Sequence, residues 1–266
     1  MYKFHNFIFR FLTLYVGIFS VSQVFALSCE ETLCKSLRVG VGIPLYQTFV
    51  AKDAHIGNSG GYFALSGRLV GYRILAEANG QVGIGRADAK ESYFANKDYK
   101  GKTTSSTLAG DIKLGLNVSS VSVPIFITGV YGFENFSLYT GGIFSNYKKD
   151  DKKGLAMSWH YAGAEINGST TLQSSSKIEY LLGYYYIINQ KSNYRFRDVG
   201  VISDFTGTNY MIKASLAYVS NFNQSMGYYV RGIYKYQNFA ASEMSNNLNY
   251  PATQNFQVLA EVGLEF

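Results

Sequence analysis

The chain has 266 residues, of which 16% are aromatic and 16% are charged, and its formal net charge is +6 at pH 7. It contains no run of about 18 apolar residues, which excludes a transmembrane helix. The basic balance comes without a motif for reading bases, so it does not indicate a nucleic-acid partner. The mean hydropathy of -0.03 is typical of strands on which an apolar face and a polar face cancel.

The first 26 residues have the pattern of a secretory signal peptide. Lys3 and Arg10 precede an apolar run from Phe11 to Phe19, and Val24-Phe25-Ala26 suits cleavage after Ala26. We therefore expect residues 1–26 to be removed and residues 27–36 to form a short periplasmic segment. Residues 37–266 would then form the folded domain.

Cys29 and Cys34 are the only cysteines of the chain. An exported chain enters an oxidising compartment, where closely spaced cysteines can pair. A local disulfide between these two residues is one interpretation, and two free thiols are the other.

After the signal, apolar and polar residues alternate in segments of strand length. The segments expected to be strands are 37–46, 61–71, 74–85, 108–118, 123–139, 157–167, 177–188, 209–219, 226–239 and 255–266. Long polar connections, beginning with 47–60, alternate with short ones, which is typical of a barrel with extended outer loops and tight periplasmic turns. The sequence therefore predicts an all-β, transmembrane, antiparallel up-and-down β-barrel of ten strands. Eight strands, with one hairpin reduced to a loop excursion, is the alternative.

The last segment alternates most strictly and ends on an aromatic residue. Glu261 and Glu265 fall on one face, and the other face carries Phe256, Val258, Ala260, Val262, Leu264 and Phe266. Open strand edges cannot be satisfied in hydrocarbon, so an apolar face of this kind requires a closed barrel if lipid is its solvent. A soluble β-sandwich fits the alternation but does not explain the terminal Phe266.

At these residues the sequence resembles bacterial outer-membrane β-barrels, specifically the outer-membrane protein A, opacity-protein and ten-stranded adhesin groups. The resemblance implies a bacterial outer-membrane location, in contact with lipid and lipopolysaccharide. It also implies that the barrel assembly machinery reads an assembly signal made of Phe256, Val258, Val262, Leu264 and Phe266.

Charged residues of both signs recur on the faces opposite the apolar ones. The predicted barrel-interior charges are Arg38, Arg68, Glu77, Asp111, Lys113, Glu134, Glu179, Lys213, Arg231, Lys235 and Glu261. Near-balanced charge in a narrow interior indicates paired, hydrogen-bonded filling, because an unpaired charge there would be costly. A charged constriction in a narrow, porin-like channel is the alternative interpretation.

The sequence predicts no enzyme, no cofactor and no metal site. Ser158 and His160 share a strand face, as a nucleophile and its base would, but outer-membrane lipases use the reverse order. Trp159 and Tyr161 look like girdle residues facing lipid, whereas Glu165, of the same parity, looks inward. A protease of the omptin type would need a His near paired acids, and Asp150-Asp151 has none beside it. Cysteine and histidine spacings match no metal site.

The outer connections mix aromatic and polar residues. The aromatics are Tyr93, Phe94, Tyr99, Tyr147, Tyr194, Phe196, Phe205 and Tyr250. Such mixtures suit recognition surfaces and equally suit the upper ends of strands that leave the membrane. We expect a non-enzymatic, adhesin-like or ligand-binding surface protein that contacts a host or environmental ligand. A narrow channel is the second interpretation, and an outer-membrane lipase, acyl hydrolase or protease is the third.

Overall fold

The computed structural model describes residues 28–30, 33–51, 54–71, 73–90, 101–120, 123–139, 153–173, 176–196, 199–204, 207–223, 225–241 and 252–266. The predicted signal peptide, Asp150, Asp151 and most of the loop aromatics, namely Tyr93, Phe94, Tyr99, Tyr147, Phe205 and Tyr250, lie outside the described residues. Tyr194 and Phe196 belong to a strand.

Twelve strands make up the regular structure of the described residues. They are β1 (Ser28–Glu30), β2 (Leu33–Ala51), β3 (Ala54–Gly71), β4 (Ile74–Lys90), β5 (Gly101–Asn117), β6 (Ile125–Tyr139), β7 (Lys153–Gln173), β8 (Ser176–Phe196), β9 (Val199–Asp204), β10 (Tyr210–Asn221), β11 (Gly227–Phe239) and β12 (Thr253–Glu265). Within the described part of the chain, no helix has the length and apolar character needed to cross a membrane.

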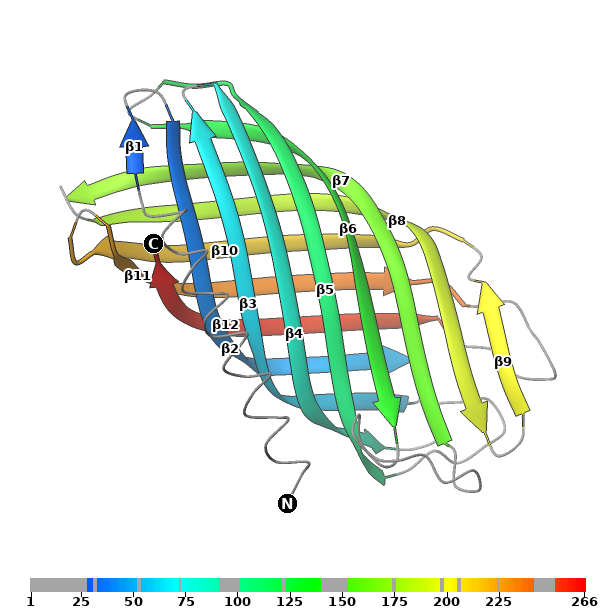
Figure 1. Cartoon of the computed structure of the whole chain (residues 1–266). Helices are drawn as coiled ribbons and strands as arrows, with labels where there is room; N and C mark the ends of the chain where they lie inside the picture. Colours follow the sequence, from blue (N-terminus) through cyan, green and yellow to red (C-terminus); the bar gives the residue numbers. More distant parts are fainter. Residues whose placement is uncertain are drawn as a thin grey trace, which may run out of the picture.

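Ten of these strands form one closed antiparallel barrel (Figure 1). Each of β2 to β8 pairs with its neighbour in sequence, β8 pairs with β10, and β12 closes the ring by pairing with β2. The short strands lie outside this ring, with β1 on the start of β2 and β9 on the end of β8. The predicted fold class and the count of ten barrel strands are therefore confirmed, and the eight-stranded alternative is wrong.

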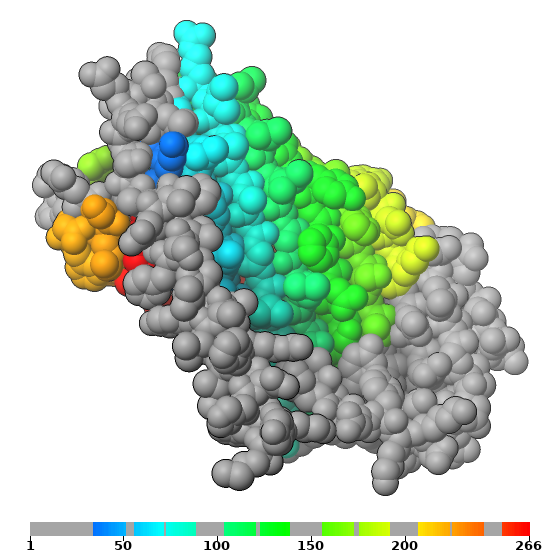
Figure 2. Space-filling view, viewed as in Figure 1, coloured from blue at the N-terminus to red at the C-terminus, as the bar shows by residue number. Residues whose placement is uncertain are grey.

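Alternation along each strand separates an apolar outer wall from a polar interior, as strand β5 illustrates. Ile112 and Leu114 point outward and are among the most exposed large apolar side chains, whereas Lys113 between them is buried. Figure 2 shows the outer wall from the side of β3 to β8. Such a wall suits contact with the hydrocarbon of a membrane, because apolar side chains are more stable there than in water.

An aromatic row marks one level of this wall across four neighbouring strands. The ring centroids of Tyr184 and Tyr210 are 5.8 Å apart, those of Tyr210 and Tyr236 are 5.9 Å apart, and those of Tyr236 and Phe256 are 5.0 Å apart. Aromatic girdles of this kind lie at the membrane interfaces of transmembrane barrels.

The first predicted outer loop, residues 47–60, is wrong. Strand β2 runs to Ala51 and β3 begins at Ala54, so residues 52–53 are the whole connection. Two of the polar residues that suggest a loop face the interior instead, where the amide of Asn58 donates to Gln47 Oε1 at 2.9 Å. Strands β7 and β8 likewise extend past the predicted bounds to 21 residues each, and β9 lies inside a predicted loop.

The N-terminal strand β1 folds back on β2. In their register Cys29 lies opposite Cys34, and Cys34 is disulfide-bonded. Strand β2 begins at Leu33, four residues before the predicted start of the barrel.

The barrel closes beside the C-terminus. The backbone N–H of Leu37 donates to the carbonyl of Phe266, and the N–H of Phe266 donates to the carbonyl of Leu37, both at 2.8 Å. These two bonds extend the β2–β12 ladder by one residue pair beyond Glu265.

Deleting Phe266 should lower assembly of the barrel, because it removes both terminal hydrogen bonds together with the aromatic side chain of the predicted assembly signal. We expect less heat-modifiable protein in the membrane fraction and unfolded chain in the periplasm, measured by gel shift of unheated samples. Phe266→Tyr, which keeps the backbone and the ring, should assemble normally. Normal assembly of the deletion variant would contradict the predicted sorting role.

Candidate functional site

The barrel interior contains a network of ion pairs, and its first group lies near the C-terminus. The Arg38 guanidinium on β2 binds Glu179 on β8 in a bidentate pair, with Nη1 to Oε2 at 2.7 Å and Nη2 to Oε1 at 2.9 Å. Nη2 of Arg38 also donates to Glu265 at 3.0 Å, and Arg68 on β3 donates to Glu179 at 2.9 Å. Because β3 and β8 lie on opposite sides of the ten-strand ring, these contacts cross the interior.

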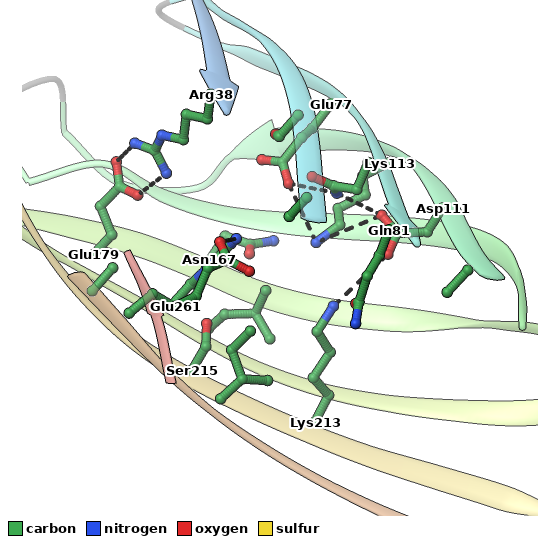
Figure 3. Close-up of a pocket in the computed structure, with 18 of the residues that line it drawn as sticks. Arg38, Glu77, Gln81, Asp111, Lys113, Asn167, Glu179, Lys213, Ser215 and Glu261 are labelled. Atoms are coloured by element: carbon green, nitrogen blue, oxygen red, sulfur yellow. Dashed lines mark hydrogen bonds and ion pairs between the residues drawn. The ribbon is translucent and has the colours of Figure 1, made fainter. Parts of the chain in front are cut away.

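The second group surrounds Lys113, whose ammonium is buried (Figure 3). Its Nζ donates to Glu165 Oε2 at 2.9 Å and lies 3.5 Å from Glu77 and 4.0 Å from Asp111. Glu165 also accepts a hydrogen bond from the Tyr185 hydroxyl. The main partner of Lys113 is therefore Glu165 on β7 and not Asp111 on its own strand.

Further ion pairs bridge distant strands. Lys213 on β10 lies 3.8 Å from Asp111 on β5. Lys235 on β11 donates to Glu134 on β6 at 2.9 Å, and Gln237 donates to the same carboxylate at 3.2 Å. Each of these contacts joins strands that are several places apart in the ring, so the interior is bridged at more than one level.

A cavity of about 110 Å³ lies within the network, between Arg68 and Glu77 on one side and Lys213 and Glu261 on the other. A second cavity of about 30 Å³ lies beside Gln47, Asn58 and Glu134. A water molecule takes about 30 Å³ of liquid volume, so the larger cavity has the size of a few waters. Drug-sized ligand pockets have about 300–1,000 Å³.

Apolar side chains fill the interior toward the end of the barrel farther from the C-terminus; we call them the apolar cap. The phenyl rings of Phe49 and Phe136 are 4.6 Å apart, and the rings of Trp159 and Phe239 meet edge-on at 5.1 Å. The cap residues are Phe49, Ala51, Ile56, Ala87, Val130, Phe136, Leu138, Met157, Trp159, Tyr161, Tyr185, Ile187, Met211 and Phe239, and all of them are buried. This cluster resembles the core of a soluble domain, and buried polar residues such as Asn255 and Gln190 lie beside it as register partners of Phe49 and Trp159.

The structure places all eleven predicted interior charges inside the barrel. Ten of them line the larger cavity, and Glu134 lines the smaller one. Two further interior carboxylates, Glu165 and Glu265, were not in the predicted set although both are buried. The alternation in the sequence could have identified Glu265 as an interior residue, because it shares a strand face with Glu261.

The structure resolves the orientation of strand β7, which the sequence leaves ambiguous. Trp159 and Tyr161, which look like girdle residues in the sequence, are buried at 1% and 6% exposure and point inward with Glu165. Their rings pack inside the apolar cap, Trp159 against Phe239 and Tyr161 against Tyr185. Ser158 is exposed on the other face, and His160 Nδ1 lies 3.0 Å from the Tyr131 hydroxyl. No group of potential metal ligands occurs among the described residues.

Comparison with known proteins places this architecture. The crystal structure of the outer membrane protease OmpT from Escherichia coli matches over 89% of this chain and 96% of that chain, with a TM-score of 0.55 and 9% identity. The translocator domain of the autotransporter NalP from Neisseria meningitidis matches over 96% and 95%, with a TM-score of 0.50 and 9% identity. The chain has the fold of an outer-membrane β-barrel.

At 9% identity the likeness extends to the fold alone. No family model and no curated protein sequence matches the chain. The narrower resemblance to outer-membrane protein A, opacity proteins and ten-stranded adhesins stays a prediction.

Proposed function

We propose that this outer-membrane barrel has a closed interior and acts through its outer connections, as a non-enzymatic surface protein that binds a host or environmental ligand. The observation that carries the proposal is the filling of the interior by cross-barrel ion pairs and the apolar cap. A barrel filled in this way is a scaffold, and its function must then lie at its ends.

An ion moving along the interior would have to separate buried pairs such as Arg38 with Glu179, at 2.7 Å, and Lys113 with Glu165, at 2.9 Å. Breaking a buried pair costs about 3–5 kcal/mol. The ion would then meet the apolar cap, whose aromatic and aliphatic side chains are buried. A narrow channel remains the second candidate, favoured by the charged cavity of about 110 Å³.

The proposed absence of enzyme chemistry is supported by the position of His160. It is the one histidine whose side chain the structure describes, and it stacks on Tyr131 on the outer wall at 5.9 Å, away from the interior carboxylates. A general base must lie within hydrogen-bond reach of the group it serves. The interior acids therefore have no described histidine beside them.

Long strands support a role for the outer connections. Strands β7 and β8 have 21 residues each, whereas a tilted strand needs about 9–11 residues to cross the hydrocarbon. Strand β9 adds a third strand to their far ends. This sheet would raise the neighbouring connections above the membrane, where a ligand could reach them.

The test exchanges the long connections 91–100, 140–152 and 242–251 for Asn-Gly turns, together and singly. The control replaces residues 174–175, at the opposite end of the barrel, with the same Asn-Gly turn. Retention of cells on glass and on a coat of basement-membrane protein is compared, with heat modifiability as the check on folding. We expect the outer exchanges to abolish retention and the control to preserve it. Equal retention in all folded variants would contradict the proposal.

A further inference from the structure

The seam between the first and last barrel strands contains a site in which one aromatic ring packs against two glycines. Tyr229 on β11, Gly263 on β12 and Gly40 on β2 are register partners in a single row. Tyr229 is buried, and its ring lies across both glycines. A Cβ atom added to Gly40 would overlap the Tyr229 hydroxyl oxygen. One added to Gly263 would overlap the backbone carbonyl oxygen of Val39 and lie 2.6 Å from Cε1 of the ring. The two glycines therefore form a notch that the ring fills.

The neighbouring rows hold the ring in this notch. The guanidinium carbons of Arg38 and Arg231 lie 5.4 Å and 5.5 Å from the ring centroid, within cation–π range. The Tyr229 hydroxyl donates to Glu261 at 2.9 Å. Glu261 also pairs with Arg231, and Arg38 pairs with Glu265 across the seam. The ring is thus held on both sides by groups fixed in the same register.

Barrel closure poses a register problem that alternation does not solve. The seam joins residues as far apart in sequence as Arg38 and Glu265. Side chains alternate with a period of two, so a slip by two residues keeps every apolar side chain facing outward. Some other feature must distinguish the native register from its even-numbered slips.

We propose that Tyr229, seated between Gly40 and Gly263, sets the register in which β12 closes on β2. A slip by two in one direction would bring Arg38 opposite Gly263, and its side chain would occupy the notch. A slip in the other direction would bring Gly42 opposite Gly263. The space over Gly42 already holds the ring of Tyr62, because a Cβ there would lie 2.6 Å from Tyr62 Cε1. Both slips are blocked.

Disulfide trapping reads the register directly. In a background with Cys29→Ser and Cys34→Ser, Val41→Cys is combined with Val262→Cys, its native partner. Val41→Cys with Leu264→Cys and with Ala260→Cys report the two slips. Directly opposite Cα atoms lie about 5.5 Å apart and bridge readily, whereas diagonal neighbours lie at about 7–8 Å, beyond disulfide reach.

With native glycines, we expect the 41–262 disulfide as the dominant product. Gly40→Ala should make it a minor product and increase the slipped pairs. Gly232→Ala, where an added Cβ meets open space, should leave it dominant. Tyr229→Ala should also admit slipped pairs, and adding Gly40→Ala to it should cause only a small further loss, because the Val262 carbonyl oxygen, 3.1 Å from the added Cβ, is then the one close contact left.

Tyr229→Ala introduces no overlap, so it serves as the decisive variant if Gly40→Ala does not fold. A Tyr229→Ala barrel that forms the 41–262 disulfide alone would overturn the proposal. The proposal would also be overturned if Gly40→Ala reduced the 41–262 disulfide as strongly in the Tyr229→Ala background as in the native one, because the glycine would then act independently of the ring.

Discussion

Replacing Lys113 with Ala is expected to lower the free energy of unfolding of the detergent-folded barrel by about 3–5 kcal/mol, because it leaves buried carboxylates without their cation. Glu165, at 1% exposure, loses its nearest ammonium, and Glu77 loses a second neighbour at 3.5 Å. The thermal unfolding midpoint measures the effect.

The matched control is Lys177→Ala. Lys177 pairs with Glu179 at 3.0 Å, but its side chain is 37% exposed, and exposed pairs contribute about 0–1 kcal/mol. Lys113→Met with Glu165→Gln should recover much of the loss, because no unpaired charge is left at that contact. Equal midpoints for Lys113→Ala and Lys177→Ala would mean that the interior is solvated.

Trp159→Ala is expected to cost about 3–5 kcal/mol, the range for removing a fully buried large aromatic side chain. Trp159 is 1% exposed and meets Phe239 edge-on in the apolar cap. Its indole N–H has no hydrogen-bond partner among the described residues, so the loss is one of packing. Urea unfolding of the folded barrel measures it.

Trp159→Phe is the control for this variant, since it keeps a ring beside Phe239 and forfeits no hydrogen bond. Its cost should stay below about 1.5 kcal/mol, as for other substitutions that largely conserve core packing. If Trp159→Ala and Trp159→Phe were equally stable, the cap would not be a packed core.

The positions of most strands along the chain were predictable from the sequence, because alternation with a period of two is a local signal. The strand ends were not, since interior polar residues such as Gln47 and Asn58 satisfy each other and read as a loop. The face of Trp159 was ambiguous in the sequence because girdle and cap both use large aromatics, and only its packing against Phe239 in the structure distinguishes them.

The interior charges could be predicted one by one, because each shares a strand face with other polar residues. Their partners could not. Lys113 pairs mainly with Glu165 on β7, and Arg38 reaches Glu179 on β8. Such pairings depend on strand tilt and on the stagger of the ring, which no single strand encodes.

A planar-bilayer recording of the purified, heat-modifiable barrel tests the closed interior most directly. Insertion is verified by protease protection of the same protein in liposomes. The closed interior predicts no steady single-channel steps at neutral pH, for the native chain and for Lys177→Ala alike. Steady steps whose cation preference changes in Lys113→Ala would contradict it and make the protein a channel.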